Sequence, residues 1–104
     1  MEFFDVFTTE HHVWAGSNGG LVYIGITDHA QSELKDIIFV DIPPVGDEIA
    51  AGVSFCTIES IKSISDVVAP VSGRIMLINE ELDVNPGIIN HNPMGTWIVA
   101  VEVS

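Results

Sequence analysis

The sequence predicts an all-β fold, a small sandwich or barrel, on two observations. Short runs rich in β-branched and aromatic residues recur along the chain, and turn residues separate them at intervals typical of such folds. The 104 residues, 47% of them hydrophobic, suffice for one core, so we expect a single domain over 1–104.

Six runs are expected to be strands, because β-branched and aromatic side chains fit a pleated, half-buried surface. In chain order they cover 21–26, 37–42, 53–58, 67–69, 74–78 and 97–103. Turn residues separate them at 19–20, 43–47, 51–52, 70–73, 85–87 and 92–95.

One short helix is expected between the first two of these strands, over 28–34. Thr27 or Asp28 can cap its N-terminus, and Asp28 and Gln31 stand at the spacing of a capping box. The helix should end near Lys35 and Asp36.

A weak internal echo flanks the second lysine of the chain, Lys62. Residues 45–49 and 71–75 each place a turn before a strand, one segment on either side of Lys62. The echo predicts two similar β halves joined at a hairpin that carries this lysine.

The charge balance limits the classes of partner. Three Lys and Arg stand against fifteen Asp and Glu, which gives a net charge of −12. This excess argues against binding nucleic acid or an anionic membrane and favours partners with basic surfaces. No apolar run reaches the length of a membrane span, and the acidic start is unlike a targeting peptide, so we expect a cytoplasmic protein.

The residues that could support catalysis form no recognisable motif. Cys56 is the single cysteine, lies in an apolar run and is expected to be a buried structural thiol. His11, His12, His29 and His91 do not have metal-ligand spacing, and neighbouring rings on a strand would point to opposite faces. We therefore expect that the chain is not an enzyme.

Lys62 is the principal candidate for a functional residue. Glu59 and Asp66 are close to it in sequence and would keep its ammonium charged, which disfavours a Schiff-base lysine. A lysine on a turn suits modification by another enzyme; the alternative is an ordinary solvated side chain. We expect Lys62 exposed at a hairpin tip, flanked by Glu59 and Asp66 and supported by Ile58 and Ile61.

Several motifs resemble the H protein of the glycine cleavage system, from about His12 to Trp97. They are Gly-Ile-Thr-Asp-His-Ala-Gln at 25–31, Glu-Ser-Ile-Lys-Ser at 59–63, Ala-Pro-Val-Ser-Gly at 69–73, Asn-Glu-Glu-Leu at 79–82, Pro86 and Asn90. His-Val-Trp at 12–14 and Ile-Pro-Pro-Val-Gly-Asp at 42–47 resemble two further motifs of that family.

This resemblance implies the barrel-sandwich hybrid fold of lipoyl domains, with lipoate joined to Lys62 through an amide. The lipoate supplies the reactivity and the protein presents it. The residues that the resemblance places at the attachment turn or beside the arm are Glu59, Ser60, Asp66, Asp28 and His29.

The implied function is a lipoyl carrier that shuttles the aminomethyl group of glycine between enzymes. The implied partners are a pyridoxal-phosphate glycine decarboxylase, a tetrahydrofolate-dependent aminomethyltransferase and dihydrolipoyl dehydrogenase. A lipoate ligase or lipoyltransferase would attach the cofactor, and the carrier is expected to be a monomer. Biotinyl carriers and 2-oxoacid dehydrogenase lipoyl domains share the fold, but their lysine motifs differ from Ile-Lys-Ser at 61–63.

The sequence departs from the family pattern at Val13, Lys35, Met94 and Thr96, and stops at Ser104, where H proteins typically continue into a helical segment. The position of Val13 is commonly acidic and part of the cleft. We therefore expect the loaded arm to be held weakly unless another acid, Asp66 first, substitutes, and Val13→Glu to strengthen it. The alternative function is an H-like relay that passes lipoate to other enzymes or is a target of regulatory modification.

Overall fold

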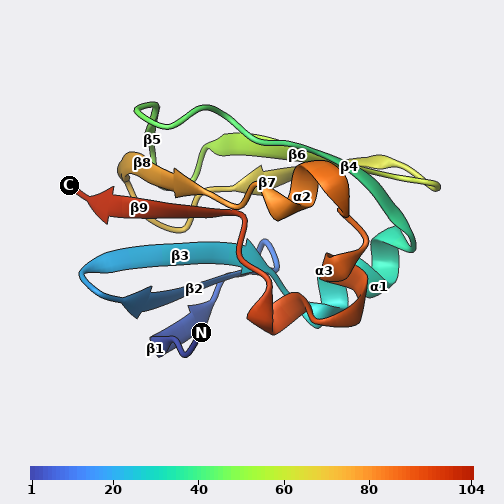
Figure 1. Ribbon diagram of the computed structural model, residues 1–104, viewed down its shortest axis with the longest axis horizontal. Helices are drawn as coiled ribbons and strands as arrows, with labels where there is room; N and C mark the ends of the chain where they lie inside the picture. The colour runs from blue at the N-terminus through green and yellow to red at the C-terminus, as the bar shows by residue number, and fades with distance from the viewer.

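The computed structural model describes residues 1–104 as two antiparallel sheets with short helices at one end (Figure 1). The larger sheet has the order β1-β2-β3-β9-β8-β5 and the smaller one the order β4-β6-β7. The strands are β1 (Phe4–Thr8), β2 (Val13–Asn18), β3 (Leu21–Ile26), β4 (Ile37–Asp41), β5 (Glu48–Ile49), β6 (Ser54–Ser60), β7 (Ile64–Val68), β8 (Gly73–Ile78) and β9 (Val99–Val103). The helices are α1 (Asp28–Leu34), α2 (Glu81–Val84), α3 (Ile88–His91) and the 3₁₀ turn η1 (Pro93–Gly95).

The mostly-β prediction is confirmed, and each of the six expected strands corresponds to an observed one. Strands β1, β2 and β5 were not expected, and neither were the single-turn helices α2 and α3. None of the helices combines the length and the apolar character needed to cross a membrane.

Helix α1 has the bounds that the sequence predicts, and its caps explain them. Thr27 takes the N-cap position, where its Oγ1 accepts a hydrogen bond from the Ala30 N–H at 3.3 Å. Asp28 instead accepts from the Gln31 side chain at 2.9 Å. The helix ends at Lys35, whose positive φ of 65° turns the chain out of the helix.

A hydrophobic core fills the space between the two sheets. It includes Ile24, Val99 and Ile75 from the larger sheet and Ile58 and Val67 from the smaller one. Their burial contributes roughly 1.5–3 kcal/mol for each large aliphatic side chain. The core thereby fixes the smaller sheet, and with it the hairpin formed by β6 and β7.

The two segments that echo each other in sequence lie side by side. Strand β5 pairs with β8, which places Glu48 opposite Arg74 and Ile49 opposite Gly73. A Cβ atom at Gly73 would meet the Glu102 carbonyl oxygen, so only glycine allows strands β8 and β9 to approach here.

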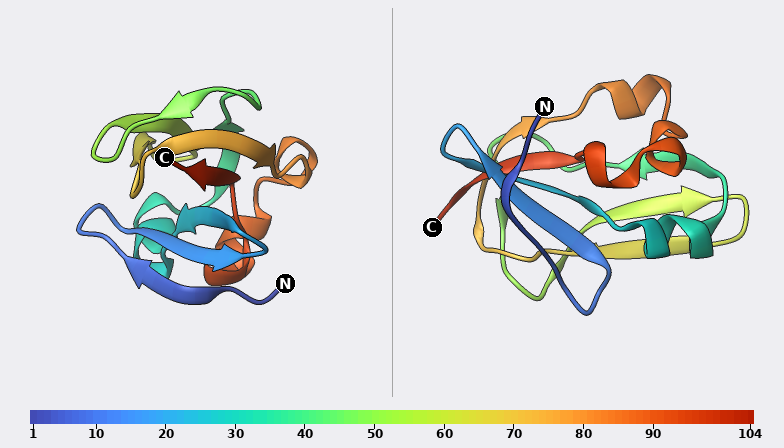
Figure 2. Two further views of the ribbon diagram at one scale, coloured as in Figure 1. Left: turned by 90° about the vertical axis from the view of Figure 1, so that its left-hand side faces the viewer. Right: turned by 90° about the horizontal axis from the view of Figure 1, so that it is seen from below.

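The segments that form the site lie at one end of the molecule. The tip of the β6–β7 hairpin lies beside α1, at the end opposite the C-terminus, in Figure 1 and in the right-hand view of Figure 2. The chain therefore brings residues from the first third and the middle of the sequence together at this end.

Candidate functional site

The tip of the β6–β7 hairpin presents Lys62 to solvent, as predicted. Ser60 organises the turn: its Oγ accepts hydrogen bonds from the backbone N–H groups of Lys62 at 3.2 Å and Ser63 at 3.1 Å. The same hydroxyl donates to the Ser63 carbonyl at 3.1 Å, and the Ser60 N–H donates to that carbonyl at 2.8 Å. The Ile61 N–H donates to the carbonyl of Asp36 at 3.0 Å, which ties the tip to the segment after α1.

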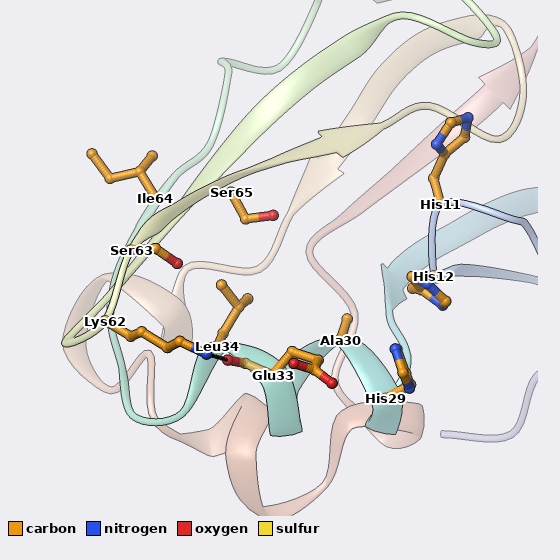
Figure 3. A pocket seen from close by; sticks show the side chains of 10 residues that line it. All are labelled: His11, His12, His29, Ala30, Glu33, Leu34, Lys62, Ser63, Ile64 and Ser65. Carbon is orange, nitrogen blue, oxygen red and sulfur yellow. Dashed lines mark hydrogen bonds between the residues drawn. The ribbon is translucent and has the colours of Figure 1, made fainter.

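The Lys62 side chain lies across to helix α1 (Figure 3). Its Nζ donates to the carbonyl oxygen of Glu33 at 3.4 Å. Carbonyl groups in the last turn of a helix lack a partner within the helix and attract a cation. An amide formed on Nζ keeps one N–H, so this bond remains available after acylation.

An open pocket of about 330 Å³ adjoins the Lys62 side chain, near the lower end of the sizes common among ligand sites. Three segments form its wall: the turn before β2, helix α1 and the hairpin tip. The lining residues are His11, His12, His29, Ala30, Glu33, Leu34, Lys62, Ser63, Ile64 and Ser65.

Two histidine rings pack together at the end of the pocket away from Lys62 (Figure 3). The ring centroids of His12 and His29 are 4.3 Å apart and the ring planes are tilted by 34°. His12 stands in a turn with a φ of 62°, held by bonds from its N–H to the Thr9 carbonyl and from the Thr27 N–H to its carbonyl, both 3.0 Å.

The assumption that His11 and His12 lie on a strand, with rings on opposite faces, is therefore wrong. The turn lets both side chains line the same pocket. His29 was expected near the cleft and does line it. No group of three or more His, Cys, Asp or Glu side chains has an arrangement that could hold a metal ion.

Glu59 and Asp66 occupy the hairpin but do not line the pocket. Glu59 pairs with Ile64 and Asp66 pairs with Thr57, and both carboxylates are exposed. Asp28 is likewise outside the pocket and hydrogen-bonds to Gln31.

Only one of the two isoleucines expected to support Lys62 does so. Ile58 is 1% exposed in the core below the hairpin, whereas Ile61 is 66% exposed at the tip. The expectation for Ile61 is wrong because the tight turn directs this residue out of the core.

Val13 is also placed differently from the expectation that it forms part of the cleft. It is 1% exposed, belongs to the core and does not line the pocket. The carboxylate that does line the pocket is that of Glu33, not Asp66.

His11, His12 and Glu33 line the pocket, although they were not predicted to belong to the site. The spacing of four between His29 and Glu33 was a usable signal, because such residues share one face of a helix. The contribution of the turn had no local signal, since it depends on the packing of β2 against the rest of the fold.

Cys56 is buried, as expected. Burial, aided by the nearby negative charge of Asp41, raises the pKa of its thiol to about 12. The thiol therefore remains protonated at neutral pH and is unreactive as a nucleophile.

The site fits a long acyl group attached to the Lys62 amine. The amine is exposed at a rigid turn, and the adjacent pocket combines the apolar surface of Ala30 and Leu34 with polar side chains. Such surroundings suit a flexible apolar chain with a reactive end.

Comparison with known proteins gives a consistent result. The family model described as "Glycine cleavage H-protein" matches residues 6–104. The glycine cleavage system H protein of Clostridium botulinum (strain Loch Maree / Type A3) is 53% identical over 96 residues, which cover 92% of this chain and 74% of that protein. That of Vibrio parahaemolyticus is 50% identical over 98 residues, which cover 92% of this chain and 78% of the relative.

A solved structure shares the fold. The crystal structure of a glycine cleavage system H protein from Mycobacterium marinum superposes with a TM-score of 0.90 at 36% identity. The match covers 96% of this chain and 84% of that one.

Proposed function

We propose, from the premise that the chain belongs to the glycine cleavage H-protein family, that Lys62 is the residue that bears its lipoyl group. The chain is a non-catalytic lipoyl carrier of the glycine cleavage system, with lipoate bound covalently to a lysine. The observation that carries the assignment to Lys62 is its exposed amine at the tip of the β6–β7 hairpin, beside the pocket.

Lys35 is the only other lysine and is a poorer attachment site. It ends helix α1 with a positive φ, and its carbonyl accepts a hydrogen bond from Asn90 at 2.7 Å. Lys35 does not line the pocket, so an arm attached there would start outside it.

The partners in the proposal are the other components of the glycine cleavage system. They are a pyridoxal-phosphate glycine decarboxylase, a tetrahydrofolate-dependent aminomethyltransferase and dihydrolipoyl dehydrogenase, with a lipoate ligase or lipoyltransferase for attachment. A tethered arm replaces free diffusion of the cofactor by a high local concentration at each docked partner. The net charge of −12 favours docking on basic surfaces. The proposal further includes that residues 1–104 form a single domain, that the protein is a monomer, and that it acts in the cytoplasm.

One ground for the relay alternative was the loss of a carboxylate at Val13. Because Val13 is buried in the core, its apolar side chain removes nothing from the pocket lining. No contact in the structure favours the relay over the shuttle.

The test is the intact mass of Lys62→Arg after exposure to a lipoate ligase and lipoate. Arginine keeps the charge of an exposed residue but lacks an acylable amine, so the variant should fold and gain no lipoyl mass. Lys35→Arg is the matched control and should be modified as the wild type is. A lipoyl increment retained by Lys62→Arg and lost by Lys35→Arg would reject the assignment.

A further inference from the structure

A continuous path runs from the Lys62 amine along helix α1 to the histidine pair (Figure 3). It begins where Lys62 Nζ contacts the Glu33 carbonyl. His29 lies four residues before Glu33 on the same helix, about 6 Å away at a rise of 1.5 Å per residue. The His29 ring in turn packs on His12.

The length of the path matches the length of a lipoyl arm. Six bonds separate the acylated nitrogen from the first sulfur-bearing carbon, and at about 1.5 Å per bond a staggered chain spans roughly 7 Å. An arm laid along α1 therefore brings its sulfur-bearing end to His29, on whose ring His12 packs.

We propose that His12 and His29 act as a paired proton acceptor for the thiols of the reduced arm, an inference that rests on lipoylation of Lys62. A proton moves from one sulfhydryl to an imidazole ring nitrogen, leaving a thiolate beside an imidazolium. No electrons are exchanged and no further reagent is needed. The thiolate is the nucleophilic form of a thiol, so the pair activates the end of the arm.

The titratable and charged groups that face the pair come from three segments. Helix α1 contributes His29 and the Glu33 carboxylate. The turn before β2 contributes His11 and His12, and amidation removes the charge that the hairpin contributes through Lys62.

His11 is the third imidazole of the pocket and has a different partner. Its Nε2 lies 3.7 Å from Glu10 Oε1, and half of its side chain is exposed. Because His11 also lines the pocket, the control is His91, an exposed histidine of α3 that does not line it.

The test is the pH dependence of alkylation of the reduced, lipoylated protein by iodoacetamide. Cys56 does not interfere, because it is buried and the pKa of its thiol is raised to about 12. The double variant His12→Asn, His29→Gln removes both acceptors. Asparagine tolerates the positive φ at position 12, and glutamine suits a helix.

We expect the apparent thiol pKa of the wild type to lie about one unit below that of the double variant. A lower pKa increases the thiolate fraction but decreases its nucleophilicity, so alkylation at pH 7 should be about threefold faster in the wild type. The exposed α3 control His91→Gln should match the wild type.

Two failures are distinguishable by mass. If Lys62 gains no lipoyl mass, the proposed function is wrong and this inference falls with it. If Lys62 is lipoylated and the wild type and double variant give the same profile, the inference alone is overturned. A shift of the same size caused by His91→Gln would also overturn the assignment to His12 and His29.

Discussion

Asn90 joins three segments behind the pocket, and its removal should weaken the fold in a defined way. Its Oδ1 accepts from the Ile37 N–H at 2.9 Å, at the start of β4. Its Nδ2 donates to the Lys35 carbonyl at 2.7 Å and to Gln31 Oε1 at 3.0 Å, at the end of α1. One side chain on α3 therefore anchors the helix that carries the Glu33 carbonyl.

The loss of stability in Asn90→Ala depends on which of the three former partners of Asn90 water can reach in the variant. Ile37 is buried, so its N–H loses its partner where water is scarce, at a cost of about 1–3 kcal/mol. Lys35 is exposed and its carbonyl can bind water, so the two other bonds contribute about 1 kcal/mol together. We expect a loss of about 2–4 kcal/mol in the free energy of unfolding.

Urea denaturation followed by circular dichroism measures this loss. At an m-value of about 2 kcal/mol per molar, the midpoint should fall by roughly 1–2 M. His91→Ala, at the next position of α3, removes an exposed side chain with no hydrogen bond and should change stability by less than about 0.5 kcal/mol. An Asn90→Ala midpoint equal to that of His91→Ala would refute the reasoning.

Two further substitutions and one alkylation experiment test other parts of the structure. Ser60→Ala removes the hydroxyl that accepts hydrogen bonds from the Lys62 and Ser63 N–H groups, so the free energy of unfolding should fall by about 1–2 kcal/mol. Hydrogen exchange of both amides, measured by NMR, should be faster. Unchanged exchange would contradict this role of the hydroxyl. Val13→Glu places a carboxyl group in the core, so it should destabilise the fold by about 3 kcal/mol or more at pH 7 and by less at pH 4, where the acid is neutral. Urea denaturation at both pH values measures the difference. Unchanged stability at pH 7 would show that position 13 faces the cleft. Cys56 should resist alkylation at pH 8 in the folded protein and react in denaturant, because burial raises the pKa of its thiol to about 12. Equal alkylation rates in the folded and the denatured protein would show an accessible thiol.

Local signals explain what the sequence predicts well. Helix α1 could be bounded because Thr27 and Lys35, which end it, are caps that act within one turn of chain. The hairpin tip was predictable because a polar segment separates two runs of β-forming residues.

The missed elements lack such signals. Strand β2 begins with four consecutive buried residues, Val13 to Gly16, so it shows no alternation of apolar and polar positions. Strand β5 has two residues and is defined by its pairing with β8. Helices α2 and α3 have four residues each, too few to show a period of 3.6.

The pocket was unpredictable for a related reason. Its three walls come from the turn before β2, from α1 and from the hairpin, and only the tertiary fold brings them together. The positive φ of His12, which turns its ring toward His29, is likewise set by backbone hydrogen bonds to residues on both sides.

The pairing of β6 with β7 divides the residues near Lys62 between two faces. Glu59 and Asp66 lie on the outer face, since alternate residues of a strand share a face and Glu59 is paired with the exposed Ile64. Ile58 and its partner Ser65 lie on the inner face, where the core gives way to the pocket. The carboxylates expected to surround the arm are thus turned away from it. This placement favours a role for them in recognition by enzymes with basic surfaces, while the inner face is left to position the arm.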